Sequence, residues 1–106
     1  MRYRVVRLMV LFDLPVDTTE DRRNYRHFRK KLIREGFYMM QYSVYVRVCA
    51  TRQSAKFLER RIANNVPESG LVQTLIVTEK QYQDMHFLAG EENHDIINSG
   101  ERTIVI

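Results

Sequence analysis

Residues 4–13 read RVVRLMVLFD, an apolar stretch that ends on a carboxylate. Between Arg4 and Asp13, both alternating sets of positions are apolar except at Arg7, so the stretch predicts a strand in the centre of a sheet. Pro15 ends this strand. Asp13 is the last residue of this strand and is therefore expected at the edge of the sheet, where its carboxylate is exposed to a ligand.

A basic helix is predicted directly after the strand. Asp17 or Thr18 can cap it, with Glu20 or Asp21 as the capping-box partner, and Gly36 is the expected stop.

The charge of this helix indicates a ligand. Residues 22–34 contain seven Lys or Arg and no Asp or Glu. Tyr25, Phe28 and Leu32 form a narrow apolar face that should pack on the sheet. Solvated helices usually mix both signs of charge, so the run favours polyanion binding over an ordinary surface. The residues predicted to bind nucleic acid are Arg22, Arg23, Arg26, His27, Lys30, Lys31 and Arg34.

The remaining elements follow from apolar alternation and capping residues. Residues 39–48 predict one long strand or a tight hairpin near residues 41–43, and residues 71–77 predict a strand. Thr51 should cap a helix that runs to about Asn65, with Ala55, Leu58 and Ile62 facing inward. Residues 78–85 predict a short capped helical turn and residues 86–89 a brief strand. Residues 103–106 predict a last strand that pairs with an edge of its own sheet or of a partner's.

This order predicts an α+β fold, a ferredoxin-like β-α-β-β-α-β sandwich with an added C-terminal strand. Residues 1–90 would form the domain, and residues 91–106 a polar tail and the final strand. Two helices should cover one sheet face. The other face, with Tyr45 and the methionines, is expected to be buried in a homodimer.

Composition restricts the class of protein. A chain of 106 residues, 44% hydrophobic and 28% charged, suits one soluble globular domain. The single Cys49 excludes an internal disulfide and argues against a thiolate zinc site, which fits a cytoplasmic setting. The longest apolar run near the start, residues 8–12, is too short for a signal peptide or a membrane span, so no membrane association is expected.

The charge is unevenly distributed. From residue 79 onward, two basic and six acidic residues give a net charge of −4, whereas residues 1–78 carry 15 basic and seven acidic residues, a net charge of +8. A basic body indicates nucleic acid on one surface. The acidic tail either meets a basic protein partner or is a solvated end.

Asp13 is the candidate catalytic residue and metal ligand. Its carboxylate suits Mg²⁺, which binds through one or two such groups and keeps several waters. One carboxylate per chain is few for a nuclease, but a two-fold dimer could bring two Asp13 side chains together. The alternative is that Asp13 only starts the turn before the helix.

Three motifs together resemble the CRISPR-associated protein 2 family, the small subunit of the spacer-acquisition machinery. They are FDLP at residues 12–15, the basic helix with its Gly-Phe ending at residues 22–37, and QYSVY at residues 41–45. The resemblance extends over essentially the whole chain, and TEKQ at residues 78–81 looks like the variant found beside type II effector systems.

This resemblance implies a ferredoxin-like homodimer whose C-terminal strands extend the partner's sheet. It implies that the dimer bridges two dimers of the CRISPR integrase subunit, with foreign duplex DNA across its basic surface. The family is also described as metal-dependent endonucleases on RNA or duplex DNA, with an Asp at the position of Asp13 as ligand. The residues then expected to meet a partner are Glu91, Glu92 and Asp95 in the tail, and Ile104, Val105 and Ile106 in the final strand.

Three functions fit these features. A DNA-binding bridge uses the basic helix, the last strand and the tail, and it is favoured. A Mg²⁺-dependent nuclease uses paired Asp13 residues. A single-stranded RNA-binding module unrelated to spacer acquisition would stack bases on Tyr42 and Tyr45, and it ranks third because the charge lies on a helix.

Overall fold

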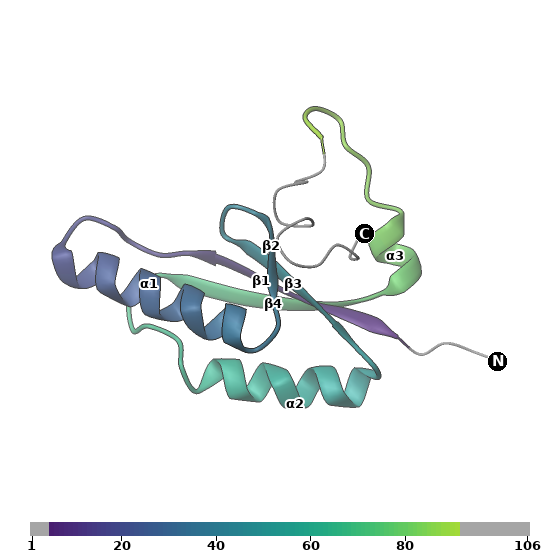
Figure 1. Cartoon of the computed structure of the whole chain (residues 1–106), viewed down its shortest axis with the longest axis horizontal. Coiled ribbons are helices and arrows are strands. Elements are labelled where there is room, and N and C mark those ends of the chain that lie inside the picture. Colours follow the sequence, from purple (N-terminus) through teal and green to yellow (C-terminus); the bar gives the residue numbers. More distant parts are fainter. Residues whose placement is uncertain (1–4, 92–106) are drawn as a thin grey trace.

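The computed structural model describes residues 5–91 of the chain. Within them it has four strands and three helices, drawn in Figure 1. Their bounds are β1 Val6–Asp13, α1 Thr19–Arg34, β2 Tyr38–Gln41, β3 Val44–Cys49, α2 Arg52–Ala63, β4 Leu71–Thr78 and α3 Glu79–Gln83. In this part of the chain, no helix has both the length and the apolar character needed to cross a membrane.

The strands form one antiparallel sheet in the order β2-β3-β1-β4. β1 is a central strand, as its apolar character on both faces predicts. Figure 1 shows α1 and α2 on one side of the sheet and α3 on the other. The α+β, ferredoxin-like fold class is therefore confirmed. The expected additional strand, residues 103–106, lies outside the described residues, and the homodimer stays a prediction.

The core lies between the sheet and the two long helices. Alternate residues of β1 point toward the helices, and the ring of Phe12 packs edge-on against Phe28 with 5.2 Å between ring centroids. Cys49 is buried, as expected, and burial raises the pKa of its thiol. The apolar helix faces predicted from spacing are confirmed. Their buried members are Phe28, Leu32, Ala55, Leu58 and Ile62, and Tyr25 packs against them half-buried.

Residues 39–48 form a hairpin, which resolves the alternative left open by the sequence. β2 and β3 pair antiparallel, with a turn at Tyr42 and Ser43. Ser43 has a φ of 66°, in the left-handed region that tight hairpin turns require.

Two expectations are wrong. Tyr45 does not lie on the open face of the sheet, because it pairs with Val10 of β1 and therefore points toward the helices, where it is 1% exposed. Residues 86–89 form no strand. Leu88 in this segment is 96% exposed, so the segment lacks the apolar burial that would hold it against an edge of the sheet.

Candidate nucleic-acid interface

The basic helix α1 begins and ends where the sequence predicts. The Thr18 hydroxyl accepts a hydrogen bond from the Asp21 backbone N–H at 3.0 Å, and the Asp21 carboxylate accepts one from the Thr18 N–H at 3.3 Å. This capping box satisfies two backbone donors of the first turn. The helix ends before Gly36, whose φ of 92° reverses the chain direction. The cationic side chains are thus carried by a rigid, well-capped element.

Five of the predicted binding residues form one exposed surface. They lie opposite the buried side chains Phe28 and Leu32. Within residues 5–91 they make no side-chain hydrogen bond or ion pair, so the charges of the four Lys and Arg side chains among them are left for a ligand. We call this surface the α1 face; its members are Arg23, Arg26, His27, Lys30 and Arg34.

The structure gives the other two predicted residues local contacts. The Arg22 guanidinium donates to the carbonyl oxygens of Val16 and Asp17, at 3.0 and 3.3 Å, and so holds the turn before the helix. Lys31 is half-buried and pairs with Glu35 at 3.1 Å. Both are therefore less available to a phosphate than the residues of the α1 face.

The helix α2 adds cations that the sequence prediction did not include. These side chains are exposed, opposite the buried stripe of the helix. The acid within α2, Glu59, accepts a hydrogen bond from Thr74 of β4. The sequence does contain a signal for these cations, because basic residues occupy the helix positions that the apolar spacing leaves on the outside. The added residues are Arg52, Lys56, Arg60 and Arg61.

Asp13 lies exposed at the end of β1, opposite Leu71 of β4. The loop before β4 approaches Asp13 closely, since a Cβ on Gly70 would lie 2.8 Å from the Asp13 carbonyl oxygen. Within residues 5–91, no three His, Cys, Asp or Glu side chains gather into a metal site. Asp21 is engaged in the helix cap. Among the described residues, Asp13 therefore has no cluster of further ligands, which suits only a water-rich Mg²⁺ ion completed by ligands from elsewhere.

Comparison with known proteins decides the family. The family model described as CRISPR associated protein Cas2 matches residues 6–85. The chain belongs to the Cas2 family. It is 62% identical to a CRISPR-associated endoribonuclease Cas2 of Lacticaseibacillus rhamnosus over 101 residues, which cover 95% of this chain and all of the relative. It is 59% identical to the protein of the same name from Ligilactobacillus salivarius, with the same coverage, and 44% identical to that of Treponema denticola.

This membership confirms the resemblance read from the sequence and supports a CRISPR-associated role. The Cas2 chain does not form the base-stacking platform of the third function, because Tyr45 is buried in the core while Tyr42 is 84% exposed in the turn. Of the residues expected to meet a partner, Glu91 is exposed. The others, Glu92, Asp95, Ile104, Val105 and Ile106, lie outside the described residues.

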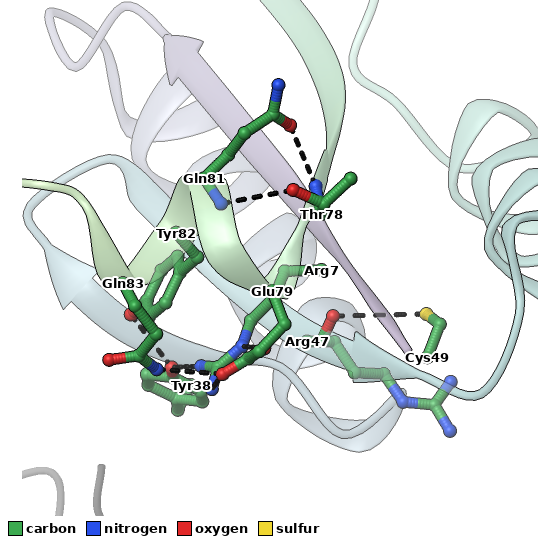
Figure 2. A network of polar contacts seen from close by, with 9 residues as sticks. All are labelled: Arg7, Tyr38, Arg47, Cys49, Thr78, Glu79, Gln81, Tyr82 and Gln83. Atoms are coloured by element: carbon green, nitrogen blue, oxygen red, sulfur yellow. Dashed lines mark hydrogen bonds and ion pairs between the residues drawn. The ribbon is translucent and has the colours of Figure 1, made fainter. Parts of the chain in front are cut away.

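A polar cluster that the sequence did not predict lies on the open face of this Cas2 sheet. Figure 2 shows the Arg7 guanidinium reaching from β1 to α3. Its Nε and Nη2 donate to the two carboxylate oxygens of Glu79 at 2.8 and 2.9 Å, and Nη1 donates to the Tyr38 hydroxyl at 2.7 Å. The guanidinium carbon lies 4.0 Å from the centroid of the Tyr82 ring. The cluster attaches α3 to the sheet.

The cluster shifts the titration of its members. The hydrogen bond from Arg7 lowers the pKa of Glu79, against a smaller opposing effect of burial. Burial, followed by the hydrogen bond with Tyr82, raises the pKa of Tyr38. Both shifts favour an ionised carboxylate beside a neutral phenol, which is the arrangement that suits a buried arginine.

Proposed function

We propose that this Cas2-family protein is a dimeric nucleic-acid-binding subunit of CRISPR spacer acquisition, which bridges integrase dimers and holds foreign duplex DNA. The observation that carries this proposal is the α1 face, whose exposed basic side chains make no ion pair within residues 5–91. Each such cation that neutralises a phosphate releases a counterion, so the face binds duplex without reading its sequence.

The dimer is supported by the open face of the sheet. Beside the Arg7 cluster, this face carries exposed apolar side chains: Val48, Leu71 and Leu75 are 45, 55 and 53% exposed. Apolar side chains gathered on one sheet face are typical of an interface. A second copy related by a two-fold axis would cover this face and leave both α1 faces outward. The tail residues predicted to meet the integrase belong to the same proposal.

The binding role is tested with duplex DNA titrated at several salt concentrations. The Arg26→Glu/Lys30→Glu variant should bind far more weakly and show a flatter dependence of log affinity on log salt, by about one unit of slope per lost phosphate contact. Lys80→Glu is the matched control for Lys30→Glu, since both reverse one exposed charge and Lys80 lies on α3. Equal effects of Lys30→Glu and Lys80→Glu would reduce the result to net charge and contradict the proposal.

Phosphodiester cleavage is the second candidate function, favoured by the exposure of Asp13 at the strand end. The relatives' names specify an endoribonuclease. If Asp13 held Mg²⁺, the ion would polarise a phosphoryl oxygen and lower the pKa of a bound water. Asp13 itself would orient the ion, and the cations of the helices would hold the phosphate backbone.

Asp13→Asn separates the two functions, because it removes the charge and keeps the side-chain shape. Wild type and variant are incubated with single-stranded RNA and with duplex DNA, in Mg²⁺ or in EDTA. Duplex affinity should be unchanged. Cutting that needs Mg²⁺ and disappears with Asp13→Asn would establish the nuclease, whereas cutting that persists in the variant would show that it does not need the Asp13 carboxylate.

A further inference from the structure

The helix α2 carries an exposed aromatic ring that duplex binding on the α1 face does not use. Phe57 is 55% exposed, although burying such a ring is worth about 1.5–3 kcal/mol. The guanidinium carbons of Arg60 and Arg61 lie 5.6 and 5.9 Å from its centroid. These arginines follow three and four residues later, which places them next to Phe57 on the helix surface.

The surroundings of the ring are cationic. Arg61 is held by an ion pair with Glu35 at the end of α1, which fixes its guanidinium beside the ring. Lys56 and Arg60 are exposed and make no ion pair within residues 5–91. Glu59 points to the sheet, where it bonds Thr74. The ring therefore lies beside positive charges, and those of Lys56 and Arg60 have no anionic partner within residues 5–91.

We propose that this α2 surface, made of Lys56, Phe57, Arg60 and Arg61, binds single-stranded nucleic acid. One unpaired base would stack on Phe57, and the neighbouring phosphates would lie at the basic side chains. Aromatic rings among cations are the arrangement that binds single strands without sequence preference. A duplex keeps its bases stacked inside and presents phosphates outward, so its bases cannot stack on the Phe57 ring. The site is thus distinct from the α1 face and does not depend on it.

The chain contains no tryptophan, so Phe57→Trp introduces a single fluorescent reporter at this position. We would titrate it with a short single-stranded oligonucleotide, with an abasic strand of equal length and charge, and with duplex DNA. The base-containing strand should quench the fluorescence, and the abasic strand and the duplex should not. The Arg26→Glu/Lys30→Glu background should keep this quenching while losing duplex affinity, which separates failure of this site from failure of the α1 face.

Affinity gives the second measurement. Phe57→Ala should weaken binding of the base-containing strand at least about fivefold, the lower end of measured stacking contributions. It should leave binding of the abasic strand and the duplex unchanged. Phe57→Leu is the matched control, since it keeps an apolar side chain without a ring and should resemble Phe57→Ala. Equal quenching by the abasic strand, or unchanged affinity in Phe57→Ala, would overturn the proposal and leave an acidic protein surface as the partner for these arginines.

Discussion

Replacing Glu79 with Gln tests how strongly the Arg7 cluster holds α3 to the sheet. The side chain of Arg7 is 10% exposed and that of Glu79 is 37% exposed. A fully exposed pair contributes at most about 1 kcal/mol, whereas removing one partner of a fully buried pair costs about 3–5 kcal/mol. This pair lies between these limits, and Gln can still accept one hydrogen bond from Arg7. We therefore expect the free energy of unfolding to fall by about 1–2 kcal/mol at pH 7.

The sign of the pH dependence follows from the lowered pKa of Glu79 in the folded state. The unfolded chain binds a proton at this carboxylate more readily than the folded one does. The stabilisation is therefore fully present above the unfolded pKa, about 4.3, and is lost as the pH falls through the folded pKa. Because Glu79→Gln removes the titrating group, the difference between wild type and variant should be constant near neutral pH and shrink in acid.

The assay is urea unfolding followed by circular dichroism at one fixed protein concentration, since the proposed dimer would make the measured stability depend on concentration. The matched control is Asp84→Asn, which breaks a pair with Lys80 at 3.9 Å whose side chains are 67 and 86% exposed. The control should cost less than about 0.5 kcal/mol. A Glu79→Gln effect no larger than the control, or one that stays constant into acid, would refute the reasoning.

Three further substitutions test other contacts. Gly70→Ala should lower the free energy of unfolding by about 1–3 kcal/mol, because Gly70 has a φ of 100° and a Cβ would contact the Asp13 carbonyl oxygen; an unchanged urea midpoint would contradict this. Thr51→Ala removes the capping box of α2 and should cost about 1 kcal/mol in the same assay, with Thr51→Ser as the variant that keeps the cap. Glu35→Gln removes the carboxylate that neutralises Arg61. Fluorescence anisotropy should therefore show that duplex DNA binds a few-fold more tightly at low salt. Unchanged or weaker binding would argue against this role of Arg61.

Local signals made most of the fold predictable. The caps at Thr18, Thr51 and Thr78 each rest on a partner three residues away, and all three capping boxes form. The central position of β1 follows from its composition alone. Such features depend on neighbours in sequence, so sequence spacing is sufficient to locate them.

The errors concern contacts between distant segments. Alternation in β3 separates two sets of side chains but does not tell which set meets the helices; the pairing of Tyr45 with Val10 decides that. Arg7 stood out as the charged exception in an apolar strand, yet its partners Tyr38 and Glu79 are 31 and 72 residues away. Likewise, the end of β1 predicts that Asp13 is exposed, but only the tertiary structure can tell whether other ligands surround it.

The contacts of the helix layer also make the binding test interpretable. Asp21 and Glu59 each accept a hydrogen bond within the fold, so replacing either acid perturbs the fold. Arg26 and Lys30 have no such contact within residues 5–91. Reversing both charges should therefore change the free energy of unfolding by no more than about 0.5 kcal/mol per substitution. If duplex binding is lost while the urea midpoint stays at the wild-type value, the loss reports phosphate contacts; a parallel fall in stability would mean that the α1 face also has a structural role.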